Sequence, residues 1–168
     1  TKNAVELIEF KTQLIASGIK IFSFPLEHFD SPEKKVYNLG YIIVNDLKES
    51  LLYVTDTKYI TYDLSRVPFT YILIEANYMN KLAQTIIYSA KKKGDNNTLM
   101  KYKRLVISHM NIENCVKTLN TFNLEGCRAI FLIHHSAETQ HYLRFKEYAK
   151  EKIKKPEIPI YVFGRIGN

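Results

Sequence analysis

"SLLYVTDTKYITYDLSRVPFTYILIEAN", residues 50–77, contains two apolar runs, and each of them ends close to a carboxylate. "LLYVTD" ends at Asp56, and "FTYILIEAN" carries Glu75 near its end. Short apolar runs rich in β-branched and aromatic residues predict buried strands. A charged group at the end of a buried strand is costly unless something uses it. Because ligands bind outside the carboxyl ends of strands in open α/β sheets, this stretch predicts a functional site at that edge.

Histidines follow three other apolar runs in the same way. His28 comes after "FSFPLE", His109 after "LVIS", and His134 and its neighbour His135 after "AIFLI". A single histidine of this kind is more often a hydrogen-bonded structural residue than a ligand. Together with the two carboxylates, however, these imidazoles suit a divalent cation such as Zn²⁺ or Mn²⁺. A carboxylate that orients an imidazole would form a second layer around that cation.

The alternation of apolar runs with helical patterns predicts an α/β (α+β) layered domain, a mixed sheet with helices packed on one face. We expect residues 39–44 and 50–56 to form a hairpin, and Pro25 to end the first strand. The segment before Gly18 has the apolar spacing of an amphipathic helix. The predicted strands are residues 19–24, 39–44, 50–56, 69–77, 105–108, 127–135 and 160–165, and the predicted helices are residues 3–17, 80–93, 112–122 and 137–153.

Length and composition predict one domain over residues 1–168, with 46% hydrophobic and 24% charged residues. No apolar run is long enough to span a membrane, and the first residues lack the pattern of a secretory signal, so we expect a cytoplasmic protein without a membrane partner. Cys115 and Cys127 are predicted to be reduced core residues. The net charge of +7 favours polyanionic partners such as nucleic acid or nucleotides, although no particular residue is assigned to that contact.

The ordered set "FPLEHFD", "NLGYIIV", "LLYVTDT", "ILIEANY", "SHMN" and "LIHHS" resembles the second half of the metallo-β-lactamase fold. The similarity is to its phosphodiesterase and nuclease branch, which includes tRNase Z and RNase J-like proteins. It covers about residues 19–137. The resemblance implies a partial metallo-β-lactamase-like layered fold and metal-dependent hydrolysis of a phosphodiester in RNA, DNA or a cyclic nucleotide.

The resemblance also implies roles for individual residues. His28 and His134 match histidine ligands of the family, and Asp56 matches the aspartate that bridges two metals. Glu75 and His109 match a glutamate–histidine pair in which the histidine protonates the leaving oxygen.

Two further polar residues next to these motifs, Asp30 and His135, are secondary candidates. The family motif His-x-His-x-Asp-His should lie upstream of His28, but no histidine precedes His28 in this sequence. Since a two-metal site needs those ligands, we expect the chain to be the carboxyl-terminal half of the centre. The other half would lie upstream or in a separate chain.

Two functions remain open from the sequence. The first is a metal-dependent phosphodiesterase or nuclease that is incomplete in this chain alone. The second is a non-catalytic nucleic-acid- or protein-binding module with a relic metal site. Half of such a fold would leave apolar sheet surface exposed. That surface predicts pairing with the missing half or homo-oligomerisation, or a cover formed by the helix predicted at residues 3–17.

Overall fold

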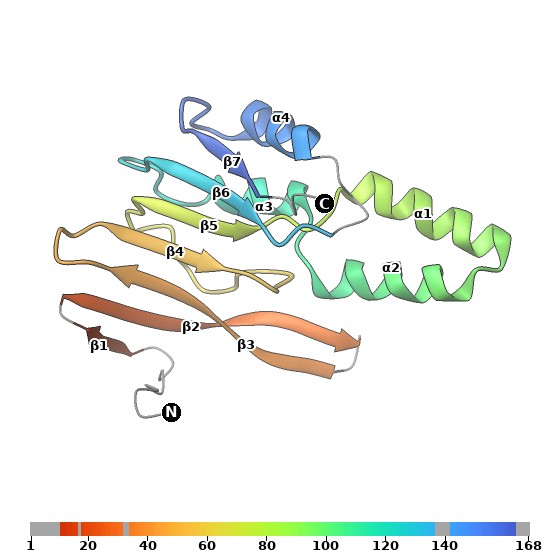
Figure 1. Cartoon of the computed structure of the whole chain (residues 1–168), viewed down its shortest axis with the longest axis horizontal. Helices are drawn as coiled ribbons and strands as arrows, with labels where there is room; N and C mark the ends of the chain where they lie inside the picture. The colour runs from red at the N-terminus through yellow and green to blue at the C-terminus, as the bar shows by residue number, and fades with distance from the viewer. Residues whose placement is uncertain (1–10, 17, 32–33, 137–141, 164–168) are drawn as a thin grey trace, which may run out of the picture.

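The computed structural model describes residues 11–16, 18–31, 34–136 and 142–163, which form one mixed sheet with helices beside and beyond it (Figure 1). The strands lie in the sheet in chain order from β1 to β7. The strands are β1 (Thr12–Ala16), β2 (Ile19–Ser31), β3 (Lys34–Val44), β4 (Ser50–Val54), β5 (Tyr71–Glu75), β6 (Ala129–Ile133) and β7 (Ile160–Val162), and the helices are α1 (Asn80–Lys93), α2 (Asn96–Ser108), α3 (Ile112–Leu119) and α4 (Tyr142–Lys152).

The sheet changes from antiparallel to parallel at β4. Strands β1 to β4 pair antiparallel, whereas β4 pairs parallel with β5, β5 with β6, and β6 with β7. Parallel neighbours bring their carboxyl ends to the same edge of a sheet. The predicted mixed α/β sheet is therefore confirmed, and the ends of β4, β5 and β6 meet at one edge.

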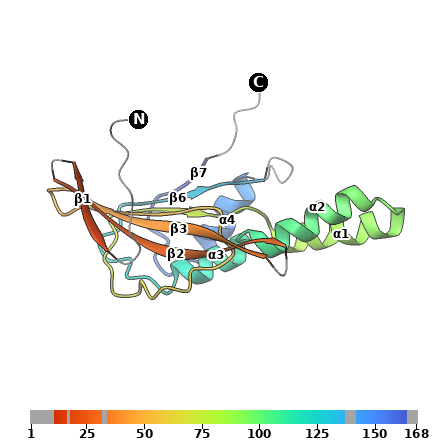
Figure 2. The same cartoon turned by 90° about the horizontal axis from the view of Figure 1, so that it is seen from below.

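Helices α3 and α4 cover one face of the sheet (Figure 2). That face is made by residues paired across β4, β5 and β6, and all of them are buried. Burial of apolar surface in this layer is the main source of stability for the fold. The sheet contributes Leu52, Val54, Ile72, Ile74, Ile130 and Leu132, α3 contributes Ile112, Cys115, Val116 and Leu119, and α4 contributes Phe145 and Ala149.

The opposite face of the sheet is largely aromatic, and the described helices leave it uncovered. Tyr41, Tyr53, Leu73, Phe131 and Tyr161 lie in register across five strands. Their rings pair, with centroids 6.4 Å apart for Tyr41 and Tyr53 and 5.2 Å apart for Phe131 and Tyr161. The side chain of Tyr161 is 48% exposed. This row of partly exposed apolar side chains is suited to contact with another protein layer.

Helices α1 and α2 form an antiparallel hairpin that projects beyond the ends of the strands instead of covering a face (Figures 1 and 2). Gly94 ends α1 with φ of +70°, a conformation that glycine adopts at low cost, and the Asp95 side chain accepts a hydrogen bond from the Thr98 N–H to begin α2. The predicted strand at 105–108 was wrong, because these residues are the last turn of α2. A short apolar run does not by itself distinguish a strand from a buried helical segment.

Two predictions near the N-terminus also need correction. Residues 12–16, expected in a helix, form strand β1 paired with β2, because tertiary pairing overrides weak helix propensity; residues 1–10 of that predicted helix lie outside the described part. Strand β2 continues through Pro25, and His28 lies within it. Pro25 is tolerated because β1 pairs with β2 only as far as Phe22, so beyond that point β2 is an edge strand on this side.

The remaining elements agree with the sequence predictions. The hairpin of β3 and β4, the strands β5, β6 and β7, and the helices α1 and α3 are confirmed. The described part of the last predicted helix is α4, while residues 137–141 lie outside the described ranges. Both cysteines are free, and Cys115 is buried in the core. No helix in the described ranges is long and apolar enough to cross a membrane.

Candidate metal centre

Glu75 is the centre of the polar cluster at the carboxyl edge of the sheet. It is the last residue of β5, and it is completely buried. Its Oε2 accepts the backbone N–H of Thr57 at 2.6 Å. Its Oε1 lies 2.7 Å from His109 Nδ1 and 3.0 Å from His134 Nδ1. One buried carboxylate therefore holds two imidazoles side by side, with their Nε2 atoms on the sides of the rings away from Glu75.

Protonation in this cluster follows from burial and from hydrogen bonding. Burial of Glu75 acts to raise its pKa, but the hydrogen bonds from His109 and His134 outweigh it and hold the pKa below its ordinary value. The hydrogen bond to Glu75 raises the pKa of His134, with burial opposing it and the negative charges of Glu75 and Asp56 adding to the rise. The carboxylate is thus kept ionised, as a partner of two imidazoles should be.

His28 and Asp56 complete what we call the histidine–carboxylate cluster, which consists of His28, Asp56, Glu75, His109 and His134. Asp56 Oδ1 lies 3.3 Å from His28 Nδ1 and 3.5 Å from His109 Nδ1. The distance between His28 Nδ1 and Asp56 Oδ1 is short enough for an ion pair, but these two atoms do not form a hydrogen bond. The buried Nδ1 of His28 has no hydrogen-bond partner among the described residues. A buried ring nitrogen in this state needs an explanation such as a bound ion.

Two residues of the cluster are held in a backbone conformation that is rare for side-chain-bearing residues. Asp56 has φ of +54° and His134 has φ of +59°. Such conformations are costly and recur at functional sites. Asn38 fixes the first of them, because its Nδ2 donates to the carbonyl oxygens of Thr55 at 2.9 Å and of Asp56 at 2.7 Å. Asn77 fixes the second by donating from Nδ2 to the carbonyl oxygen of His134 at 2.7 Å.

The donor set fits a divalent cation. Ligand atoms of Asp56, His109 and His134 all lie within 4.8 Å of one another, which is the spacing of groups that surround one ion. Imidazole and carboxylate are ligands that Zn²⁺ and Mn²⁺ both accept. The buried His28 Nδ1, which has no hydrogen-bond partner among the described residues, and the imidazoles oriented by Glu75 support the same conclusion.

The two secondary candidates are not brought into this cluster. Asp30 pairs with Lys34 at 3.3 Å and with Arg104 at 3.1 Å. His135 Nδ1 lies 2.6 Å from the carbonyl oxygen of Ala76, and its ring packs edge-on against Phe145 with centroids 5.0 Å apart. His135 Nε2 also lies 3.0 Å from a carbonyl oxygen, that of Leu132, so the surroundings of this ring are those of a structural residue.

Sequence reasoning missed three residues that position the cluster: Asn38, Thr57 and Asn77. Thr57 and Asn77 lie inside the quoted motifs "LLYVTDT" and "ILIEANY", within two residues of Asp56 and Glu75, and these positions were a usable signal. Asn38 opens the quoted motif "NLGYIIV", but its role depends on a contact from β3 to the end of β4, which the motif alone does not indicate. Asn111 caps the N-terminus of α3, because its Oδ1 accepts the Asn114 N–H at 2.7 Å.

We expect the metal-free chain to be most stable between about pH 4.5 and 6.5. The lowered pKa of Glu75 means that its carboxylate stabilises the fold above its ordinary value of 4.5, and this contribution is lost as pH falls further. The raised pKa of His134 means that its imidazolium stabilises the fold below the ordinary value of 6.5, and this contribution is lost as pH rises through the raised pKa. Thermal unfolding with a chelator present, from pH 3 to 9, measures both limits.

The variant His134→Gln provides the control for this pH dependence. It should flatten the decline on the alkaline side, and it should also weaken the decline on the acidic side, because it removes one of the two imidazoles that lower the pKa of Glu75. An alkaline decline of the same size in the variant would assign that effect to another group.

Comparison with known proteins finds similarity at the level of structure. No protein-family model and no curated protein sequence matches the chain. Yeast PDE1 in its unliganded form is similar with a TM-score of 0.62 and 14% identity, over 94% of this chain and 47% of that one. Zn²⁺-bound PqqB from Methylobacterium extorquens has a TM-score of 0.60 and 11% identity, over 94% and 53%. Igni18, a metallo hydrolase from the archaeon Ignicoccus hospitalis, has a TM-score of 0.58 and 13% identity, over 95% and 57%.

The described chain therefore has the fold of the metallo-β-lactamase-type metallohydrolases. It spans about half of the length of the structures that it resembles, from 47% to 57%. The expected resemblance is confirmed for the fold.

Proposed function

We propose that this chain supplies one half of a metal-dependent centre that hydrolyses phosphodiester bonds of RNA, DNA or a cyclic nucleotide. The observation that carries the proposal is the buried carboxylate of Glu75 joined to both His109 and His134 beside Asp56. The similarity to a Zn²⁺-bound protein and to a metallo hydrolase supports the metal-dependent part. The similarity to yeast PDE1 supports the phosphodiester part.

In this proposal Asp56, His28 and His134 hold a Zn²⁺ or Mn²⁺ ion. Such a cation polarises a phosphoryl oxygen and activates the attacking water. Glu75 holds the ring of His109 through Nδ1, so that the orientation of this imidazole is fixed. His109 is then placed to donate a proton from its other ring nitrogen to the leaving oxygen, as a general acid.

We expect His109→Ala to lower kcat about 10²- to 10⁴-fold in the complete enzyme, the usual contribution of a general acid. Because His109 also lies within reach of the cation at Asp56 and His134, metal content distinguishes the two roles. Unchanged metal content by mass spectrometry supports the proton donor. Loss of metal along with activity would make His109 a ligand.

The remaining ligands of the proposed centre come from another half. The similar structures are about twice as long as this chain, and the aromatic face of Tyr41, Tyr53, Leu73, Phe131 and Tyr161 is left uncovered by the described helices. Apolar surface of this extent favours contact with a second layer, which is a half supplied upstream, by a separate chain, or by a second copy.

The alternative is a non-catalytic nucleic-acid- or protein-binding module with a relic metal site. One observation favours it: within the described residues the grouped donors come from Asp56, His109 and His134 alone, fewer than a two-metal centre needs. Hydrolysis of bis-p-nitrophenyl phosphate with added Mn²⁺ or Zn²⁺ separates the two functions. Activity that Asp56→Asn removes supports the enzyme, and binding of the ion without turnover in the fully assembled protein supports the module.

A further inference from the structure

The α1–α2 hairpin carries most of the net charge of the protein. Residues 80–108 include seven lysine and arginine residues and one aspartate, a net +6 out of the +7 of the whole chain. All seven cationic residues are exposed. They are Lys81, Lys91, Lys92, Lys93, Lys101, Lys103 and Arg104.

Helix stability explains only part of this concentration of charge. Lys91, Lys92 and Lys93 occupy the last turn of α1, where cations interact favourably with the helix dipole. Lys101 and Lys103 precede the last turn of α2, which contains no basic residue. No acidic residue stands three or four positions before or after either of them, so pairing along the helix does not account for their presence. Interactions within the two helices therefore do not explain the positive charges of Lys101 and Lys103.

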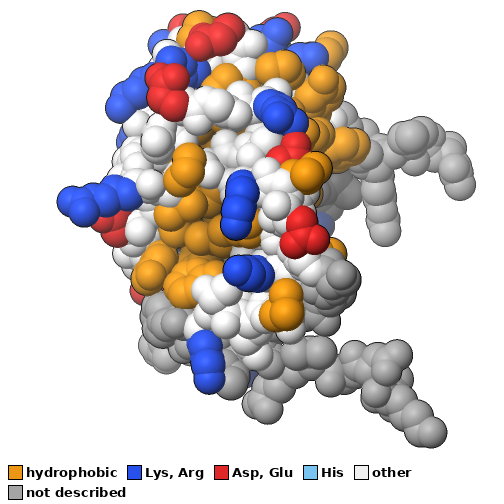
Figure 3. Space-filling model, turned by 90° about the vertical axis from the view of Figure 1, so that its left-hand side faces the viewer, with side chains coloured by type: hydrophobic (Ala, Val, Ile, Leu, Met, Phe, Trp, Pro, Cys, Tyr) orange, Lys and Arg blue, Asp and Glu red, His pale blue; other side chains and the backbone are white. Residues whose placement is uncertain are grey.

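The opposite end of the molecule differs in charge. Figure 3 views that end, where lysine, arginine, aspartate and glutamate side chains are interspersed around hydrophobic surface. The positive field of the protein is thus concentrated on the side from which the hairpin projects. Such an asymmetric field steers polyanions toward one part of a protein.

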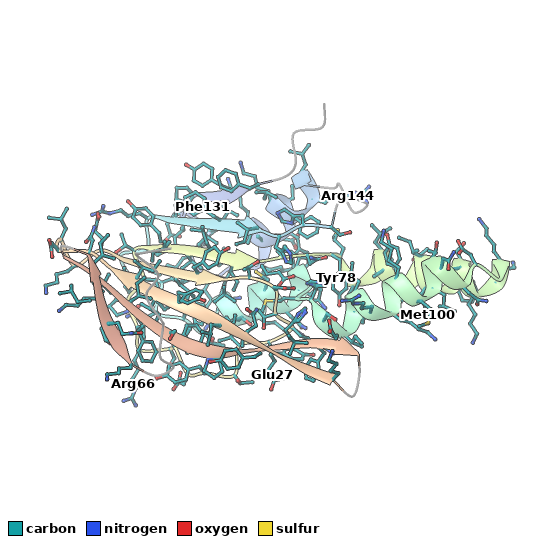
Figure 4. All side chains as sticks on the ribbon, turned by 60° about the horizontal axis from the view of Figure 1, so that its bottom comes forward. Glu27, Arg66, Tyr78, Met100, Phe131 and Arg144 are labelled. Carbon is teal, nitrogen blue, oxygen red and sulfur yellow. The ribbon has the colours of Figure 1, made fainter. Side chains whose placement is uncertain are left out.

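The base of the α1–α2 hairpin adjoins the histidine–carboxylate cluster in the chain. Helix α1 begins at Asn80, five residues after Glu75, and His109 directly follows α2 as its C-cap. Tyr78 and Tyr102 pack in a small core at its base, and Figure 4 shows Tyr78 there and Met100 further out along α2. With a rise of about 1.5 Å per residue, each helix extends about 20 Å from the cluster. That length corresponds to roughly six nucleotides of a duplex strand at about 3.4 Å each.

A hollow of about 730 Å³ lies along the hairpin, beside the end of β2. Its lining combines apolar side chains with lysine and arginine side chains. Two of the lining residues, Arg104 and Asp30, form an ion pair in which Nη2 and Oδ1 are 3.1 Å apart. Surfaces that bind nucleic-acid strands combine cations for the phosphates with apolar or aromatic groups for the bases. The lining residues are Asp30, Ile87, Met100, Lys101, Lys103, Arg104, Val106 and Ile107.

We propose that the α1–α2 hairpin binds the phosphate backbone of a polynucleotide and directs it to the histidine–carboxylate cluster. This inference rests on the proposed function for the meaning of the cluster, and it selects RNA or DNA over a cyclic nucleotide as substrate class. A cyclic nucleotide has one phosphate and cannot contact the cluster and the distant cations together. A polynucleotide presents phosphates along the whole hairpin.

The test is fluorescence anisotropy with labelled 20-nucleotide RNA and DNA, single-stranded and duplex, titrated at several salt concentrations. The variant Lys92→Gln, Lys101→Gln, Lys103→Gln removes three charges from the hairpin. The control Lys20→Gln, Lys48→Gln, Arg66→Gln removes three exposed charges away from it, and Figure 4 shows Arg66 at the far end of the molecule from Met100. Circular dichroism verifies that both variants are folded.

We expect the hairpin variant to bind single strands at least about tenfold more weakly at 0.1 M salt. The slope of log K against log salt should become less steep by about 2, since each phosphate contact contributes about 0.7. The control should change affinity less than twofold, and a 4-nucleotide probe should bind much more weakly than the 20-nucleotide probe. Equal losses in both variants, or no binding by the wild-type chain, would overturn the proposal.

The same variants separate this proposal from the proposed function. The hairpin variant should bind Zn²⁺ or Mn²⁺ as the wild type does, because its substitutions lie outside the cluster. Suppose that the wild type binds neither Zn²⁺ nor Mn²⁺, and that oligonucleotide binding is lost in the hairpin variant but not in the control variant. The hairpin proposal then stands, and the hydrolytic function does not. If metal binding succeeds and the two triple variants bind oligonucleotides equally, the hairpin proposal is wrong and the hydrolytic function stands.

Discussion

Asp56→Asn is expected to weaken binding of Zn²⁺ or Mn²⁺ by at least about 100-fold, a larger loss than removal of a group that only orients a ligand. Asp56 Oδ1 lies 3.3 Å from His28 Nδ1 and 3.5 Å from His109 Nδ1, so the substitution removes a negative charge that lies between these two imidazoles. Asparagine is the suitable replacement because Asp56 has φ of +54°, a conformation that asparagine tolerates. The fold should therefore remain intact. Isothermal titration of the metal-free chain with each ion measures the loss.

Asp30→Asn is the matched control for this experiment. Asp30 is also a carboxylate on the strand that carries His28, but it is paired with Lys34 and Arg104 outside the cluster. The control should bind the ion as the wild type does. Equal affinity of the Asp56 variant and the wild type would contradict the assignment of Asp56 as a ligand.

Glu75→Ala is expected to have the largest effect on stability, about 3–5 kcal/mol, the usual cost of removing one partner from a buried ionic network. The substitution leaves the Thr57 N–H without its acceptor and removes the shared partner of His109 and His134. For a chain of this length the melting temperature should fall by roughly 10 °C. Chemical denaturation of the metal-free protein measures the change in the free energy of unfolding.

Two variants show whether the effect depends on the position of Glu75. Glu75→Gln keeps the shape and an acceptor for Thr57, so it should lose clearly less stability than Glu75→Ala. Glu125→Ala removes an exposed carboxylate paired with Lys155 and should change stability by less than about 1 kcal/mol. A Glu75→Ala effect as small as that of Glu125→Ala would contradict a structural role for the buried carboxylate.

The sequence by itself determined the elements that form the edge of the sheet. The apolar runs of β4, β5 and β6 identified buried strands, and the polar residues after them identified Asp56, Glu75 and His134 as neighbours. Strand periodicity and composition are local properties, and the meeting of parallel strand ends follows from topology. For this reason the mixed sheet and the location of the cluster could be predicted from the amino-acid sequence alone.

Tertiary structure decided what the local pattern leaves ambiguous. The run before His109 has the composition of a strand, yet it forms the last turn of α2, because packing of Tyr102 and Leu105 against α1 and the base of the hairpin outweighs strand propensity. Residues 12–16 became a strand because the edge of β2 offered hydrogen-bond partners. Contacts between residues far apart in the chain also decided which side chains share Glu75, and which charges project on the α1–α2 hairpin. Such contacts depend on how the elements pack in three dimensions, which no local sequence window contains.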